Sequence, residues 1–379
     1  MGLFSLPPAQ SRADLNLDMF LGGNDGGKVQ KKMRRVMPAE WFPQSAVQLT
    51  WPHENTDWAY MLQDVTACYV RMAFEIATRE KLIIVAPDVA SVKSLLEERL
   101  PRRATENITY VACPTNDTWA RDHAFITVIG EKNPELLDYR FNGWGGKFEA
   151  SLDNAINRHL FEEGIVGGEY KDCLDFELEG GSIESDGQGL LLTTSRCLLN
   201  DNRNASMTKE DIEQRLKTDL GVEKILWLNH GELSGDDTDA HVDTLARLCP
   251  DDTIVYVSCD DTEDPHYEEL KKMEEELQAF RTQSGASFRL IPVPLPDAIY
   301  DEDGLRLPAT YANFLIMNTM NTAVLYPTYA QPEKDEATRQ ALQRAFPKAD
   351  LVGIDCRPLI RQHGSLHCAT MQYPKGVVK

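Results

Sequence analysis

The sequence is short of positive charge. Its 379 residues contain 39 Lys and Arg against 60 Asp and Glu, which gives a formal net charge of −21. Nucleic acids and anionic membranes are bound by basic surfaces, so neither is an expected partner. The acidic balance instead favours a small cationic ligand, although the same charge also serves solubility alone.

Long apolar runs and paired cysteines are missing as well. No run approaches the length of a membrane span, and the first residues, MGLFSLPPAQSR, lack the basic stretch and apolar block of a signal peptide. The eight cysteines are scattered without a CxxC pair. This pattern argues against structural zinc and fits a reducing compartment, so we predict a cytoplasmic protein.

Two parts of the chain differ in composition. Residues 1–37 contain LGGNDGGK and then KKMRR, and they predict a flexible or loosely docked extension. We expect residues 38–379 to form a single catalytic domain, and we expect a homo-oligomer, to whose contacts the extension could contribute.

The remaining sequence repeats one order of elements. Strand, polar turn, strand, helix and strand recur in units of roughly 60–70 residues, with helices expected near 208–219 and 332–346. An amphipathic helix is expected after the candidate caps Asn55 and Thr56, and another after Asp264. Repetition at this length predicts α/β modules arranged around a centre, with a doubly wound α/β sheet as the alternative.

Polar residues gather at strand ends and turns beside the apolar runs. In repeated α/β units such positions converge at one end of the molecule, where sites are built. The candidates are Trp119, Arg121 and Asp122; Glu179, Gly180 and Gly181; Asp237, His241 and Asp243; Asn313; and His367 and Cys368.

The segment DDTDAHVD gives the sharpest local pattern. In a strand, His241 and Asp243 would face the same side. An exposed polar strand end is one interpretation, and a histidine acid or base beside a cation-binding carboxylate is another. A third is a metal site built from Asp236, Asp237, Asp239, His241 and Asp243.

The other polar segments also leave alternatives open. Glu179 precedes two glycines, which indicate either a plain turn or a place where a ligand approaches the backbone closely. In NDTWARD, Asp117, Arg121 and Asp122 taken alone predict surface ion pairs. FNGWGGK (141–147) predicts a structural turn.

Cys368 lies in the polar stretch QHGSLHCATMQYP, unlike the cysteines in apolar surroundings. A cysteine attacks only as thiolate, and thiolate forms beside a cation or a protonated imidazole. His367 would point away from Cys368 in an extended segment, and His363 has no geometric claim, so His241 is the better partner. Thiol-dependent acyl transfer stays open but is disfavoured by the surplus of carboxylates over oxyanion donors.

Six segments together resemble one known family. MPAEWFPQSAVQLTWP, NDTWARD, FNGWGGK, LEGGSIESDGQGLLLTTSRCLLNDNRN, DDTDAHVDTLARL and GSLHCATMQ occur in the order found in the agmatine deiminase and bacterial peptidyl-arginine deiminase family. The resemblance covers about residues 37–375. It implies the pentein fold, an α/β propeller of five ββαβ-like units around a pseudo-fivefold axis. It also implies hydrolysis of a guanidine to a urea without a metal or organic cofactor.

The resemblance implies a role for each matching residue. These roles are nucleophile for Cys368, general acid and base for His241, acidic partner of that histidine for Glu179, guanidinium-binding carboxylates for Asp122 and Asp243, and substrate-lining wall for Trp119. Two segments depart from the family pattern: His363 replaces a glycine before the HC pair, and RDHAFITV replaces the commoner RDxGPTF.

Agmatine is the expected substrate, because neither a signal peptide nor an added β-sandwich of the secreted peptidyl-arginine branch is visible. Free-arginine deimination would need a carboxylate-binding arginine, for which Arg121 or Arg203 is available. A peptidyl-arginine deiminase and a non-catalytic guanidine-binding protein are the further alternatives.

Overall fold

The computed structural model describes residues 35–378, and the strands within them form five separate sheets. Four sheets have three strands, in the orders β4-β5-β6, β7-β8-β9, β10-β11-β12 and β13-β14-β15, and the fifth has the order β16-β1-β2-β3. The predicted five-unit α/β propeller is therefore confirmed. The doubly wound alternative is wrong, because it needs one continuous sheet.

The elements follow each other in the predicted order. The strands are β1 (Gln44–Thr50), β2 (Lys81–Ala86), β3 (Ile108–Ala112), β4 (Ile126–Ile129), β5 (Pro134–Arg140), β6 (Glu169–Glu177), β7 (Ile183–Ser185), β8 (Leu190–Thr194), β9 (Lys224–Leu228), β10 (Ala246–Cys249), β11 (Thr253–Ser258), β12 (Arg289–Pro294), β13 (Leu315–Asn318), β14 (Thr322–Thr328), β15 (Asp350–Asp355) and β16 (Thr370–Pro374). The helices are η1 (Ala59–Met61), α2 (Leu62–Ala77), α3 (Val89–Arg99), α4 (Arg102–Thr105), α5 (Ala120–His123), α6 (Gly143–Gly146), α7 (Ser151–Glu162), η2 (Gly180–Ser182), α8 (Ser195–Leu198), α9 (Lys209–Leu220), η3 (Val242–Thr244), α10 (Tyr267–Ala279), α11 (Pro332–Ala345) and η4 (Leu359–Gln362).

Each unit combines an antiparallel strand pair with a parallel one. One parallel pair in each unit, β1-β2, β5-β6, β8-β9, β11-β12 or β14-β15, is joined by α2, α7, α9, α10 or α11 respectively, and a sixth parallel pair, β2-β3, extends the fifth sheet. A helix is needed because parallel neighbours cannot be connected by a tight turn. The predicted caps of two helices are wrong: η1 precedes α2 instead of a cap at Asn55 or Thr56, and α10 begins after His266.

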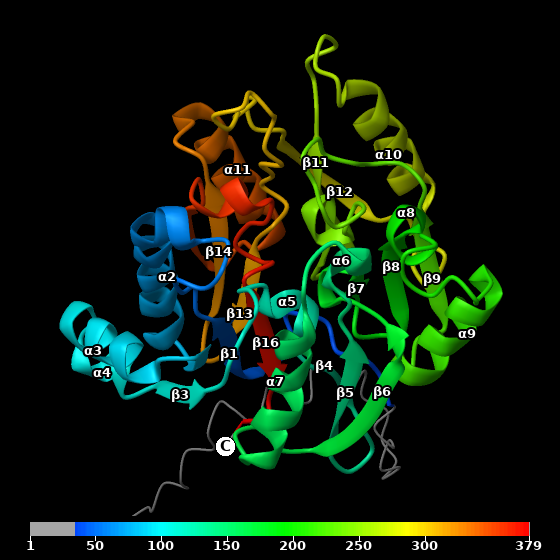
Figure 1. Ribbon diagram of the computed structural model, residues 1–379. Helices are drawn as coiled ribbons and strands as arrows, with labels where there is room; N and C mark the ends of the chain where they lie inside the picture. Colours follow the sequence, from blue (N-terminus) through cyan, green and yellow to red (C-terminus); the bar gives the residue numbers. More distant parts are fainter. Residues whose placement is uncertain (1–34, 379) are drawn as a thin grey trace, which may run out of the picture.

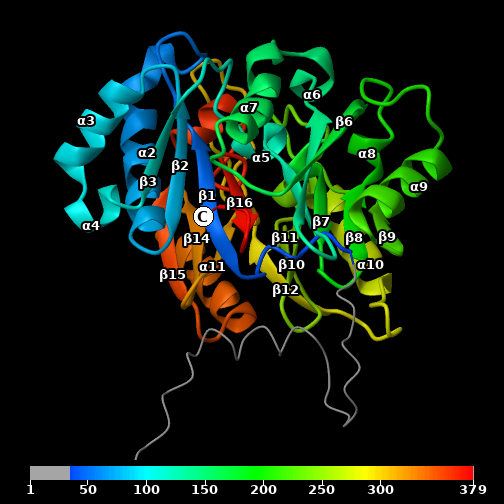
Figure 2. The ribbon, with the colours of Figure 1, turned by 90° about the horizontal axis from the view of Figure 1, so that it is seen from below.

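The two ends of the described chain close the ring. β16 pairs antiparallel with β1, with Leu49 opposite Thr370, and β1 pairs parallel with β2. In Figure 1 the units follow one another around the molecule from blue through green to orange, and the red β16 lies beside the blue β1. Figure 2 shows the same ring of units from below. The fold thereby joins a segment near residue 370 to one near residue 45.

One position recurs in all five units. Directly before the first strand of each antiparallel pair lies a short turn or helical segment: α5 before β4, η2 before β7, η3 before β10, residues 310–314 before β13, and residues 366–369 before β16. Among these segments α5 contacts η2 and β16, η2 contacts η3, and Asn313 contacts Asp243 and Cys368. The repeat thus brings five separate polar segments to one place.

The predicted extension 1–37 lies outside the described residues except for its last three. Arg35 forms an ion pair with Glu135, Val36 pairs with Ile129, and the Met37 amide donates to Leu220. Within residues 35–378, no helix combines the length and apolarity needed to cross a membrane.

Candidate active site

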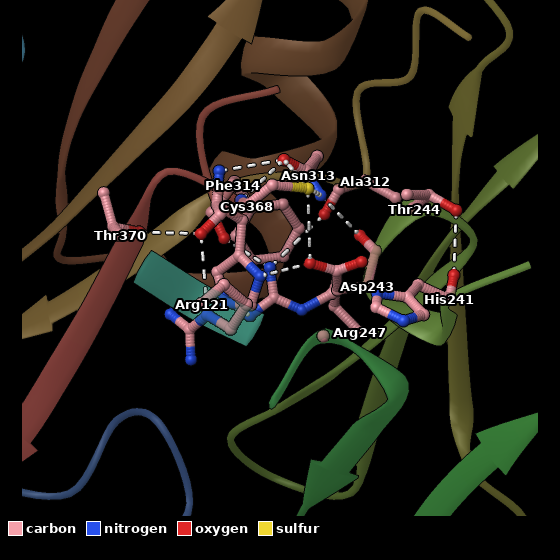
Figure 3. Close-up of polar contacts among 12 residues, drawn as sticks. Arg121, His241, Asp243, Thr244, Arg247, Ala312, Asn313, Phe314, Cys368 and Thr370 are labelled. Carbon is pink, nitrogen blue, oxygen red and sulfur yellow. Dashed lines mark hydrogen bonds and ion pairs between the residues drawn. The ribbon is translucent and has the colours of Figure 1, made fainter. Parts of the chain in front are cut away.

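Cys368 lies in the turn directly before β16 and is 4% exposed. Its sulfur is 3.2 Å from Nδ2 of Asn313 and 3.7 Å from Oδ2 of Asp243, and Figure 3 shows the three side chains together. Burial raises the pKa of the Cys368 thiol well above its usual value, and the charges of Asp243 and Asp122 raise it further. In the free protein this cysteine is therefore a neutral thiol that faces two acids.

Asp122 is held on the short helix α5. Its Oδ1 accepts a hydrogen bond from the Gly181 amide at 3.0 Å, and its Oδ2 accepts one from Nε1 of Trp144 at 3.0 Å. The prediction of surface ion pairs is wrong for Arg121 and Asp122, because these side chains are buried at 4% and 3% exposure. The segment FNGWGGK is more than a structural turn, since its tryptophan binds a site carboxylate.

His241 and Asp243 do not lie on a strand. Asp239 and Ala240 both have φ near 65°, and His241 then precedes the 3-10 helix η3, which contains Asp243. The prediction of a shared strand face is therefore wrong. Both side chains still reach the site: Nδ1 of His241 is 3.5 Å from Oδ1 of Asp122, while Asp243 contacts the sulfur of Cys368.

Gly181 shows how tightly these groups are packed. A Cβ at this position would lie 2.6 Å from Nδ1 of His241, 2.8 Å from Oδ1 of Asp122 and 3.2 Å from Oδ2 of Asp243. At Gly180 a Cβ would lie 2.2 Å from the Arg121 carbonyl oxygen. The two glycines therefore leave room for the protein's own side chains and backbone, and the prediction that they admit a ligand is corrected.

His241 is fully buried among acids. Burial lowers the pKa of a histidine, but the neighbouring Asp122, Cys197 and Glu179 outweigh it and raise the pKa of His241 to about 10. At Asp122 burial dominates over the attraction of His241 and raises the pKa to about 6. The two partners thus shift in the same direction, and at neutral pH both carry charge: the imidazole is protonated and the carboxylate ionised.

Glu179 lies near His241 but is bound by an arginine. Its Oε1 accepts from Nε of Arg203 at 2.9 Å, and one of its oxygens, a His241 nitrogen and the Cys197 sulfur lie within 4.8 Å of one another. Arg203 also pairs with Asp239 and donates to the Thr238 carbonyl oxygen. This arginine is committed to the protein's own acids.

His367 departs from its predicted position. Residues 366–369 form a turn rather than an extended segment, and Nδ1 of His367 lies 2.8 Å from Oδ2 of Asp243. Nε2 of the same ring lies 2.7 Å from Oε2 of Glu40, which comes from the segment before β1. Sequence reasoning missed Glu40, Trp144 and Arg247 as site neighbours, because each arrives from a distant segment without a local pattern.

A pocket opens above these groups. Cys368, Asp122 and Gly364 lie in it with the aromatic side chains Trp119, Trp144 and Phe148, and its remaining lining is Asp57, Asp117, Asp237, Thr238, Gln362 and His363. His241, Asp243 and Glu179 do not line the pocket but lie buried directly behind Asp122 and Cys368.

His363 has φ of 64°, a left-handed conformation that favours glycine. Its Nδ1 lies 2.7 Å from the Gly235 carbonyl oxygen, and its Nε2 lies 3.7 Å from Oδ2 of Asp237. The imidazole therefore occupies the pocket wall beside an acidic residue.

Among residues 35–378, two groups of buried side chains have the composition of metal ligands, Glu179 with Cys197 and His241, and Glu40 with Glu184 and His367. Their carboxylates are already paired with guanidinium groups, Arg203 in the first group and Arg247 in the second. The metal site predicted from Asp236, Asp237, Asp239, His241 and Asp243 is neither of these two groups. Its Asp239 forms ion pairs with Arg203 and Lys147 instead.

Comparison with known proteins gives a consistent result. A model of the Porphyromonas-type peptidyl-arginine deiminase family matches residues 36–374. The agmatine deiminase of Pseudomonas syringae pv. tomato is 33% identical, with 89% of this chain and 95% of that protein covered.

Two solved structures are similar over nearly their whole length. A Porphyromonas gingivalis protein named provisionally as an arginine deiminase has a TM-score of 0.86 at 49% identity, covering 91% of this chain and 100% of that one. An agmatine deiminase variant of C. jejuni with substrate bound has a TM-score of 0.83 at 38% identity, covering 93% and 99%. The chain therefore belongs to the Porphyromonas-type peptidyl-arginine deiminase family.

Proposed function

We propose that this protein is an agmatine deiminase, which hydrolyses the guanidinium of agmatine to N-carbamoylputrescine and ammonia. One observation carries the proposal: a buried cysteine, Cys368, lies beside two aspartates, Asp122 and Asp243, at the base of one pocket, with His241 next to them. Relatives that cover about nine tenths of the chain bear the name agmatine deiminase, which supports this substrate.

The two aspartates suit a guanidinium in geometry and charge. A guanidinium is planar and presents its N–H donors in a fork that fits carboxylates. Oδ1 of Asp243 and both ring nitrogens of His241 are buried without a hydrogen-bond partner among the described residues. Such atoms indicate where substrate donors and a leaving nitrogen bind, because buried polar groups are ordinarily paired. To reach them, the guanidinium has to pass between Asp122 and Cys368, which line the pocket.

Binding of the cation prepares the nucleophile. The acids that raise the pKa of the Cys368 thiol are the ones that pair with the guanidinium. Once the positive substrate neutralises Asp122 and Asp243, the thiol releases its proton to solvent more readily, so we propose that the substrate itself promotes thiolate formation. The aspartates also fix the central carbon against the sulfur, which is the positional part of the catalysis.

The reaction then follows in two halves. The thiolate of Cys368 adds to the guanidinium carbon, protonated His241 gives a proton to one nitrogen, and ammonia leaves, so that an S-alkylthiouronium remains on the sulfur. Neutral His241 next takes a proton from water, and the resulting hydroxide adds to the same carbon. The C–S bond then breaks to release the ureido product, and the hydroxyl proton passes to the sulfur, which restores the thiol and protonated His241. The pKa of His241 near 10 keeps it protonated for the first half.

Glu179 and Trp119 act beside these groups in the proposal. Glu179 lies within reach of His241 and is itself fixed by Arg203, so it holds the imidazole in position and favours its charged form. Trp119 forms a wall of the pocket, packed against Gly364, where a Cβ would lie 2.3 Å from the indole.

The mouth of the pocket favours an ammonium tail over a carboxylate. Asp57, Asp117 and Asp237 line it, and the two arginines considered for carboxylate binding are engaged elsewhere: Arg203 is paired with Glu179, and Arg121 is absent from the lining. Agmatine and free arginine both carry an amine at this end, but free arginine adds an α-carboxylate, so the acidic mouth attracts agmatine and disfavours free arginine.

A substrate panel tests the proposal. Ureido product and ammonia are measured with agmatine, free arginine and a peptide with C-terminal arginine, for wild type and for Cys368→Ala. We expect turnover of agmatine above the other two and none with C368A, whose folding is checked by circular dichroism. Faster turnover of free arginine or of the peptide would show that agmatine is not the preferred substrate. A tenth of wild-type turnover in C368A would refute the covalent mechanism. Binding of agmatine without ammonia release would indicate a guanidine-binding protein.

We also propose a cytoplasmic location and a homo-oligomer. All eight cysteines are free, which supports a reducing compartment. Light scattering on the purified protein tests the oligomer, and fractionation of the native cell tests the location.

A further inference from the structure

Behind the proposed site lies a buried cluster of charged groups, of which the proposed reaction uses only Asp243. His367 is its centre. Asp243, Glu40, Glu184 and Arg247 lie beside its ring, and Nε of Arg121 donates to its backbone carbonyl oxygen at 3.5 Å. All are at most 8% exposed. They come from the segment before β1, from α5, β7, η3, β10 and the turn before β16. The cluster therefore ties the start of the described chain to the cysteine turn.

The two ring nitrogens of His367 each face a carboxylate oxygen. Nδ1 lies 2.8 Å from Oδ2 of Asp243 and Nε2 lies 2.7 Å from Oε2 of Glu40. A neutral imidazole donates from one nitrogen only, so the imidazolium is the form that donates to both carboxylates at once. Nε2 is also 3.0 Å from Nη2 of Arg247, and that nitrogen is 2.7 Å from the same Glu40 oxygen. In the imidazolium, Nε2 and Nη2 both donate to this Glu40 oxygen, whereas in a neutral ring protonated at Nδ1 the Nε2 atom would accept from Nη2, so the two states differ in the protonation of Nε2.

The charges of the cluster point the same way. Glu40, Glu184 and Asp243 are three acids against the two guanidinium groups of Arg121 and Arg247, so a positive His367 balances the buried set. Burial works to raise the pKa of Glu40, but His367, Arg247 and Arg121 hold it well below its usual value. Burial raises the pKa of Glu184 despite its contact with Arg247. For Asp243, burial is outweighed by His367 first and then by His241 and Arg247, and the pKa is lowered.

We propose that His367 is a positioning residue, an imidazolium clamped between Glu40 and Asp243 that fixes Oδ2 of Asp243 and leaves Oδ1 for the guanidinium. The backbone of the same turn is fixed too, since the amides of His367 and Cys368 both donate to Oδ1 of Asn313, at 2.8 and 3.2 Å. One short turn therefore carries both the proposed nucleophile and the group that orients the substrate carboxylate. This inference rests on the proposed function for its kinetic readout.

Two matched variants separate the contacts. In His367→Asn the amide nitrogen takes roughly the place of Nδ1 and still donates to Asp243, whereas in His367→Gln it takes the place of Nε2 and donates to Glu40 instead. We expect kcat/KM for agmatine to fall roughly ten- to a hundredfold in H367Q, the effect of one hydrogen bond to a charged group, and less in H367N. We expect most of this fall to come from a higher KM. The acid limb of the pH profile of kcat/KM moves to higher pH in H367Q, because His367 no longer lowers the pKa of Asp243.

A control and a second measurement complete the test. His266→Gln removes a histidine–aspartate contact of the same 2.8 Å length outside the pocket, and we expect it to leave the acid limb in place. Nitrogen-15 NMR of histidine-labelled wild type, with the His367 signals assigned by their loss in H367N, reports protonation without turnover. We expect both ring nitrogens of His367 to be protonated at pH 7.

One unprotonated ring nitrogen, or equal kinetics of H367N and H367Q with an unshifted acid limb, would overturn the inference. Absence of turnover in the wild type would refute the proposed function alone, because the NMR measurement still decides the state of His367.

Discussion

Asp122 and Asp243 approach the same cysteine from two regions of different character. Asp122 accepts from two neutral donors, the Gly181 amide and the Trp144 indole, and burial raises its pKa to about 6. Asp243 accepts from His367 within a cluster of cations, and its pKa is lowered although burial opposes this. Two carboxylates proposed for one task are therefore held in opposite electrostatic surroundings.

The difference indicates a division of labour. Asp243 stays ionised throughout the working pH range and serves as a fixed anchor for a cation. Asp122 lines the pocket, and its pKa of about 6 is close to neutral pH, so its charge changes readily when a cation binds. A site with two such carboxylates avoids the cost of two unpaired buried charges before the substrate arrives. The following predictions test this contrast.

The largest effects are expected from Asp122→Asn and Asp243→Asn. Each removes one charge-assisted contact to the guanidinium, worth about 2–5 kcal/mol, so kcat/KM for agmatine falls by about a thousandfold in both. Stability separates the two. D243N leaves the His367 cation without its partner and lowers the free energy of unfolding by about 3–5 kcal/mol. D122N also takes an anion from His241, but Glu179 still supports the charge of that imidazole and the pKa of Asp122 is already raised to about 6, so we expect D122N to lower the free energy of unfolding less.

Steady-state kinetics and chemical denaturation at pH 7 measure the two effects. Equal destabilisation by D122N and D243N would show that the cationic cluster does not distinguish the two carboxylates, and the contrast would fail.

The pH dependence of stability gives the next largest effect. The pKa of His241 rises to about 10 in the folded protein from an ordinary value near 6.5. Its stabilising contribution is therefore complete below pH 6.5 and is lost as pH rises toward 10. We expect the free energy of unfolding of wild type, relative to His241→Asn, to shrink by a few kcal/mol between pH 6.5 and 10. Denaturation curves at several pH values measure it, and a constant difference would contradict the assigned charge of His241.

A smaller effect is expected from Trp144→Phe. The indole donates to the ionised form of Asp122, so its loss raises the pKa of that carboxyl by roughly one unit and moves the acid limb of kcat/KM, expected near pH 6, upward. Below pH 6 this is about a tenfold loss. Trp227→Phe is the matched control, because its indole donates to Glu213 at 2.8 Å away from the pocket. An acid limb that W144F leaves unmoved would assign it to another group.

The fold and the proposed polar segments could be predicted from the sequence because each depends on local order. Apolar strands alternate with helices such as α9 and α11, and this alternation is visible residue by residue. The resemblance supplied roles for residues such as Cys368 and Asp122 that no local pattern could give. The structure adds that these residues occupy the same place in successive units, directly before a strand.

The remaining contacts could not be predicted, for two physical reasons. His241 and Asp243 fit strand alternation, and only the left-handed backbone at Asp239 and Ala240 turns the chain out of a strand. Glu40 meets His367 across 327 positions, and no periodicity reports a contact of that separation. Glu40 and Arg247, which belong to the cluster around His367, were therefore not predicted from the sequence.

The smallest effect is expected at the pocket mouth, where the acidic side chains are exposed to solvent. Asp237→Asn and Asp57→Asn each remove one acidic charge from the lining, at positions that stay partly or largely exposed. Exposed charge pairs contribute less than about 1 kcal/mol, so we expect KM for agmatine to rise by roughly two- to fivefold with kcat unchanged.

Salt sharpens this last prediction, because it screens exposed charges far more than buried ones. High salt is expected to erase the difference between D237N and wild type while leaving that between D243N and wild type in place. Asp303→Asn, at an exposed aspartate outside the pocket, is the control that shows no change in KM. If D237N lowers kcat as strongly as D122N does, then Asp237 belongs with the reacting groups, and the division between an ionised anchor and a responsive pocket carboxylate has to be redrawn around three aspartates.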